Sequence, residues 1–128
     1  QDCVHEQPGR LRYFDALQVT LEAEANLLLG STDLAFTPSK ILAVLAAGRP
    51  VLALAPVGSA MIPRLTGLGQ DCVSFAAGKP DPVAVRATVD WLQGLAAGRA
   101  PVPPPAALTT FDARTVAGRQ LAVLAAAT

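Results

Sequence analysis

The sequence NLLLGSTDLAFTPSKILAVLAAGRPVLALAP, residues 26–56, carries the strongest indication of the fold. Its two apolar runs, residues 26–29 and 51–55, have the length of buried strands rather than of helices. The stretch between them predicts a helix that starts around Pro38, since proline is tolerated in a first turn. Gly48 is suited to end that helix in a left-handed conformation. We therefore expect a strand–loop–helix–strand unit of an α/β domain.

The same alternation of strands and helices extends along the rest of the chain. The further expected elements are an edge strand at 11–14, a helix from Asp15 to about Glu24, a short helix capped by Ser59, a strand at 72–75, a helix opened by Asp81-Pro82 and a last helix opened by Asp112. Strands that alternate with helices form parallel sheets with right-handed crossovers. The order predicts a Rossmann-like, three-layer α/β/α fold with a parallel sheet of three to four strands.

The chain length supports one domain, which spans residues 1–128 and which we expect to be a fragment of a longer protein. Residues 11–98 form its α/β core, 99–110 a proline-rich connector and 111–127 the C-terminal helix. Ten basic residues balance ten acidic ones, so the charge does not indicate a nucleic-acid partner. The apolar runs are too short to cross a membrane, and no signal peptide is visible.

Cys3 and Cys72 are far apart and lack the spacing of a metal site, so we expect free thiols and a cytoplasmic location. His5 has no partner that would suggest catalysis, and a surface histidine is the expected role. No metal constellation, catalytic triad or paired carboxylates emerge, and no cofactor is expected.

The loop that follows residues 26–29 is the first candidate binding site, because ligands of parallel sheets bind outside the carboxyl ends of the strands. Its candidate residues are Ser31, Asp33, Thr37, Ser39 and Lys40. The loop leads into a helix start, where free N–H groups attract phosphate. Two simpler roles stay open: Thr37 or Ser39 as a helix cap beside a solvated Lys40, and Asp33 as the acceptor of an Asx-turn.

Gly58 and Ser59 repeat this arrangement after the strand at 51–55, with a glycine that permits close approach and a serine at a helix start. The simpler role of Ser59 is again that of a cap. A third segment, residues 76–81, is expected at the same edge of the sheet.

Residues 25–53 resemble the C-terminal domain of GT-B glycosyltransferases, of the group 1 or family 4 type. The likeness lies in an apolar strand followed by PSK at 38–40, LAAGRP at 45–50 and VLA at 51–53. A looser likeness covers roughly residues 11–125 and includes GKPDP at 78–82 and FDAR at 111–114.

The resemblance implies that the chain binds the nucleotide-diphosphate part of a sugar donor, with residues 37–40 facing the phosphates or the sugar. The parent enzyme would transfer the sugar to an acceptor bound by an N-terminal GT-B domain, so the fragment alone is expected to be inactive. Peripheral association of the parent with membranes is also expected. An exposed sheet edge near residues 11–30 would favour homo-oligomers.

Two positions depart from that family. Ala43 and Ala35 stand where many members carry glutamates that hold the donor ribose and sugar. This departure favours an alternative, a non-catalytic GT-B-derived module that serves assembly or partner binding. A flavodoxin-like nucleotide-binding domain would share the topology, but no strand is followed by GxGxxG or a P-loop.

Overall fold

The computed structural model describes residues 3–76 and 81–126, and it confirms an α/β fold with a parallel sheet. In this part of the chain the sheet contains β1 (Asn26–Leu29), β2 (Val51–Pro56) and β3 (Asp71–Phe75), in the order β1-β2-β3. Leu27 pairs with Leu52 across β1 and β2. The three apolar runs of the sequence therefore become the three described strands.

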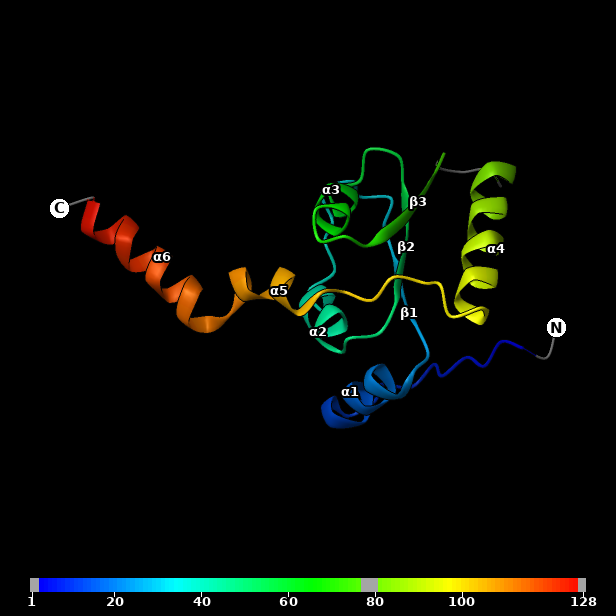
Figure 1. Ribbon diagram of the computed structural model, residues 1–128, viewed down its shortest axis with the longest axis horizontal. Coiled ribbons are helices and arrows are strands. Elements are labelled where there is room, and N and C mark those ends of the chain that lie inside the picture. Colours follow the sequence, from blue (N-terminus) through cyan, green and yellow to red (C-terminus); the bar gives the residue numbers. More distant parts are fainter. Residues whose placement is uncertain (1–2, 77–80, 127–128) are drawn as a thin grey trace.

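The helices lie on both sides of this sheet and beyond it (Figure 1). Their bounds are α1 (Tyr13–Glu22), α2 (Ile41–Ala46), α3 (Met61–Thr66), α4 (Pro82–Ala96), α5 (Pro105–Leu108), the 3-10 helix η1 (Thr109–Phe111) and α6 (Ala113–Ala126). Figure 1 shows α2 and α3 on one side of the sheet and α4 on the other, while α6 projects away from the body.

The hydrophobic core lies between the sheet and the helices α2 and α3. Its buried members are Leu28, Leu45, Val51, Ala53, Ala55, Met61 and Leu65. β2 is the central strand, and five of its six residues are buried. Its small residues, Ala53 and Ala55, let the short helices α2 and α3 pack close to the sheet.

The opposite face of the sheet is covered only in part by α4. Leu27 and Leu29 point to this face and are 55% and 61% exposed. None of the residues of α4 is buried. Trp91 of α4 donates a hydrogen bond from Nε1 to Asp71 Oδ2 at 2.7 Å, which ties the helix to β3. The larger cluster of buried side chains therefore lies on the α2 and α3 side, and Leu52 and Val73 are buried on the α4 side.

The expected edge strand at residues 11–14 is wrong, because α1 already begins at Tyr13. A half-buried strand needs alternate side chains to be covered, and Leu11, Tyr13 and Phe14 are all exposed. Asp15 does not cap the helix but lies in its first turn, where it accepts a 2.8 Å hydrogen bond from Arg12 Nε. Local contacts within one helical turn replace the pairing that a strand would need.

The expected start of the second helix is also wrong. α2 begins at Ile41 rather than at Pro38, and no side chain caps it. The Ile41 N–H bonds to Pro38 O at 3.2 Å, so the segment between them forms a separate turn. Gly48 ends the helix with a φ of 65°, as predicted.

The later helix starts agree better with the sequence. Asp81 caps α4, since its Oδ1 accepts hydrogen bonds from the N–H groups of Val83 at 2.9 Å and Ala84 at 3.3 Å. Asp112 precedes α6 and accepts the Thr115 N–H at 2.8 Å. The proline-rich connector at 99–110 contains the helix α5 and the start of η1.

Candidate functional site

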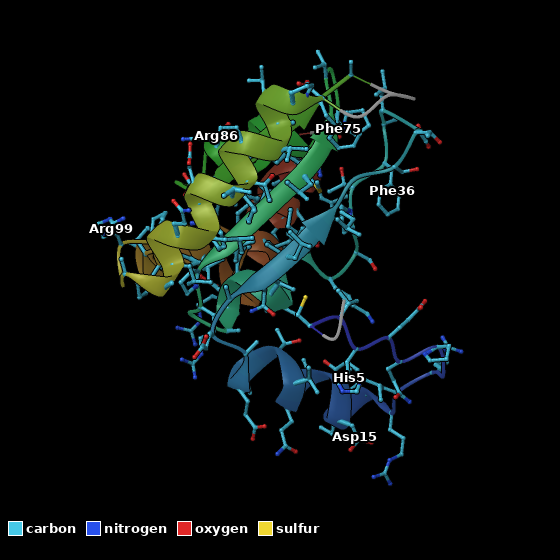
Figure 2. All side chains as sticks on the ribbon, turned by 90° about the vertical axis from the view of Figure 1, so that its right-hand side faces the viewer. His5, Asp15, Phe36, Phe75, Arg86 and Arg99 are labelled. Atoms are coloured by element: carbon cyan, nitrogen blue, oxygen red, sulfur yellow. The ribbon has the colours of Figure 1, made fainter. Side chains whose placement is uncertain are left out.

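The loops that follow β1 and β2 meet at the carboxyl edge of the sheet. The Ala60 N–H donates to Leu34 O at 2.7 Å, which joins the two loops directly. Gly58 adopts a φ of 85°, a conformation that favours glycine, and a Cβ on it would lie 3.6 Å from Leu34 Cδ1. Figure 2 shows Phe36, in the loop after β1, and Phe75, in β3, at the same end of the sheet.

The first half of the β1–α2 loop is held by its own side chains. The Asp33 N–H donates to Ser31 Oγ at 3.2 Å, and the Ala35 N–H donates to Asp33 Oδ1 at 3.0 Å. Asp33 therefore makes the Asx-turn that the sequence analysis left open. Its carboxylate is still exposed and can accept a further hydrogen bond.

The second half of this loop leaves donors unused. Ser39 and Lys40 are exposed, and Thr37 is half-buried. In residues 3–76 and 81–126, no hydrogen bond has the backbone N–H of Ser39 or Lys40 as its donor. No carboxylate of the described chain pairs with the Lys40 ammonium. Two N–H groups and one cation are therefore free to meet an anion at this turn.

Ser59 is placed differently from the other candidates, because it is only 2% exposed. Its Oγ accepts a hydrogen bond from the Met61 N–H at 3.3 Å, at the start of α3. Ala60 is the N-cap of α3 and no side chain caps this helix, so Ser59 is not the expected cap and closes a turn directly before the helix instead. A role of Ser59 in ligand binding stays a prediction.

A cavity of about 420 Å³ lies between α1 and α2, next to Lys40. Its lining includes Arg10, Tyr13, Leu17, Lys40, Ala43 and Val44. Leu17, Ala43 and Val44 provide apolar walls, and the two basic side chains make the cavity suited to an anionic ligand with an apolar or aromatic part. The cavity adjoins only the Lys40 part of the predicted site, because none of the other predicted residues lines it.

Arg10 and Tyr13 were missed by sequence reasoning, since residues 11–14 had been expected in a strand. The helical start of α1 brings them to α2 instead. Arg10 follows Pro8-Gly9 in a polar segment, and nothing in that pattern marks it as a site residue.

The two resolved pKa shifts lie outside this region. Burial raises the pKa of the Cys72 thiol, and the negative charge of Asp71 raises it further. The Thr115 N–H and hydroxyl lower the pKa of Asp112.

Both cysteines are free thiols, as expected. Within the described residues no cluster of metal-ligating side chains occurs. Among the same residues no helix is long and apolar enough to cross a membrane. Ala76 and Asp81 are described, but residues 77–80 of the third expected edge segment lie outside the described ranges.

Comparisons of this chain with protein-family models, curated proteins and solved structures found no match.

Proposed function

We propose that this chain is the C-terminal, donor-binding part of a GT-B fold glycosyltransferase. In this role it binds a nucleotide-diphosphate sugar at the turn before α2, and the parent protein transfers the sugar to an acceptor held by a separate N-terminal domain. The fold would be a Rossmann-like, three-layer member of the α/β class. The parent would be a cytoplasmic protein that can associate peripherally with membranes.

The turn at Ser39 and Lys40 is the observation that carries the proposal. It ends the loop that leaves the carboxyl end of β1, and it combines two unused backbone N–H groups with an unpaired ammonium. A diphosphate accepts hydrogen bonds from such donors and gains from the positive charge. Because α2 has only six residues, its dipole adds little, and the contacts at the turn have to supply the binding energy.

The cavity between α1 and α2 supports a place for the nucleoside beside that turn. Lys40 belongs to both features, so a diphosphate at the turn would direct its nucleoside into the cavity. Tyr13 can pack against a base or ribose, and Arg10 adds a second positive charge. The expected transfer mechanism is electrostatic, with these groups stabilising the charge that develops on the diphosphate leaving group.

A non-catalytic module is the second candidate, and Ala43 is the observation that favours it. Ala43 lines the cavity, so a methyl group stands where many family members would present a glutamate to the donor ribose. A methyl group cannot accept the hydrogen bonds of a ribose diol. A module that kept the fold and lost the donor site would show the same residue.

Calorimetric titration of the chain with UDP-glucose, GDP-mannose, UDP and GDP tests the proposal. Binding is expected for at least one of these compounds. Lys40→Ala should weaken it by roughly 10- to 100-fold, as for the loss of a hydrogen bond to a charged group. Ser39→Ala should weaken it less, because the backbone N–H groups stay in place.

Arg99→Ala provides a matched control, since Arg99 is an exposed cation beyond the end of α4. Figure 2 shows it far from Phe36 and its loop. Equal affinity of the wild type, the Lys40 variant and the Arg99 variant would remove the anion-binding turn from the proposal. Absence of binding to all four compounds would favour the non-catalytic module.

A further inference from the structure

Helix α6 has few contacts within its own chain. It is 14 residues long and has no buried residue, and its main described contact is with η1 directly before it. Figure 1 shows it leaving the body as an extended arm. An isolated helix of this length is marginal in water, and Gly118 in its middle weakens it further. Such a helix needs a surface to pack against.

The sequence of α6 places an apolar stripe between two arginines. At about 3.6 residues per turn, Val116, Leu121, Val123 and Leu124 fall within roughly 160° of the helix circumference. Leu121, Val123 and Leu124 are 66%, 70% and 65% exposed. Arg114 and Arg119 fall at the two borders of this stripe, and α6 contains no acidic residue.

The body of the molecule has an apolar groove on the α4 face of the sheet. A groove of about 400 Å³ runs between α4 and β1, with Leu27, Leu52, Leu54, Leu92 and Leu95 in its lining. Leu27 and Leu92 are 55% and 51% exposed. Glu24 also lines the groove, and its carboxylate has no ion pair in the described chain.

The stripe of α6 and the groove beside α4 are both apolar, but they cannot meet within one molecule. α5 contacts α2, so the chain enters α6 from the α2 side of the sheet, whereas the groove lies on the α4 side (Figure 1). The apolar stripe with its arginines complements the apolar groove with its carboxylate. We propose that α6 of a second copy of this chain lies in the groove beside α4, with its Arg119 paired to Glu24, and that the two copies exchange their helices reciprocally.

The area available is sufficient for such an exchange. Each exposed Leu or Val of the stripe and the groove presents on the order of 100 Å² of apolar surface. Two symmetrical contacts would then bury on the order of 1,200 Å² in total, the lower end of the range for stable interfaces. Reciprocal exchange of a helical arm also gives closed, two-fold symmetry.

Sedimentation equilibrium of the full chain, from about 1 to about 300 μM protomer, tests the proposal, because association depends on concentration. A dimer is expected, and Leu121→Glu in α6 and Leu27→Glu in the groove should each weaken it by at least about tenfold. Val57→Glu is the matched control, since Val57 is 65% exposed outside both surfaces. It should leave the dimer unchanged.

A charge exchange keeps the test valid if Leu27→Glu fails to fold. Glu24→Arg and Arg119→Glu should each weaken the dimer, and the double variant should restore it to within about threefold of the wild type. A monomer at every concentration overturns the proposal. A dimer that needs Leu121 but not Leu27 also overturns it, as does a double variant no stronger than the weaker single one. The inference is independent of the proposed function, because donor binding is measured separately at Lys40.

Discussion

Gly30 lies against Ala55 so closely that a Cβ at Gly30 would be 2.9 Å from both the Cα and the Cβ of Ala55. The Gly30 N–H also donates to Leu54 O at 2.7 Å, so the end of β1 is held against β2. This contact sets the point from which the β1–α2 loop leaves the sheet. The absence of a side chain at residue 30 therefore lets the end of β1 lie this close to β2.

Substitution Gly30→Ala is expected to lower the free energy of unfolding by about 1–3 kcal/mol, because the added methyl overlaps the buried backbone of β2. Urea denaturation followed by circular dichroism measures the change. Gly94→Ala in α4 serves as the control, since a Cβ there meets no atom within 4 Å. That substitution should be neutral or stabilising, and equal losses from both variants would contradict the close-contact argument.

Gly118→Ala should stabilise α6 by about 0.5–1 kcal/mol, because alanine loses less backbone entropy in a helix than glycine. A Cβ at residue 118 meets no atom within 4 Å, and the position lies opposite the apolar stripe. At elevated temperature, the variant should show a larger helical signal in far-ultraviolet circular dichroism than the wild type. The dimer affinity should not fall, and a weaker dimer would place residue 118 in the contact surface.

The start of α6 should depend on pH through Asp112. Hydrogen bonds from the Thr115 N–H and hydroxyl lower the pKa of this carboxyl group below its ordinary value. A lowered pKa in the folded state means that the ionised carboxylate stabilises the helix above the ordinary carboxyl pKa, near about 3.9. The stabilisation is lost as the pH falls through the lowered pKa.

The helical signal of the wild type should therefore fall more between about pH 5 and about pH 2 than that of Asp112→Asn. Asparagine keeps a capping oxygen but does not titrate. All other carboxylates are common to the two proteins, so the difference between their titration curves isolates Asp112. Superimposable curves would show that this cap does not support α6.

The two thiols should differ in reactivity. Cys3 is exposed, whereas Cys72 is half-buried and its pKa is raised by burial and by Asp71. A raised pKa leaves less thiolate near pH 8, so Cys72 should react with a disulfide reagent at least about tenfold more slowly than Cys3. Cys3→Ser isolates the slow reaction, and unfolding in guanidinium should remove the difference. Equal rates in the folded protein would contradict the burial of Cys72.

The strands could be predicted from the sequence because their apolar runs are short and are bounded by glycine, proline or polar residues. Asn26–Leu29 and Val51–Pro56 follow directly from that pattern. The capping carboxylates of Asp81 and Asp112 were equally informative, since each stands directly before its helix. These signals are local, and local signals are what a single sequence states most directly.

The errors concern features that depend on neighbours. Residues 11–14 carry strand-like residue types, but the described chain offers them no strand to pair with, and α1 forms instead. Pro38 is compatible with a helix start, yet the Ile41 N–H bonds to its carbonyl oxygen and closes a turn first. The cavity with Arg10 and Tyr13 arises only from the packing of α1 beside α2, which no motif records.

The hydrogen bond between Trp91 and Asp71 has a practical consequence. Trp91 is the only tryptophan of the chain, and it both ties α4 to β3 and lines the groove beside α4. Its ultraviolet emission is therefore an intrinsic optical probe of that one face of the sheet. Filling of the groove should shift the emission to shorter wavelength, whereas a ligand at Lys40, on the α2 side, should leave it unchanged.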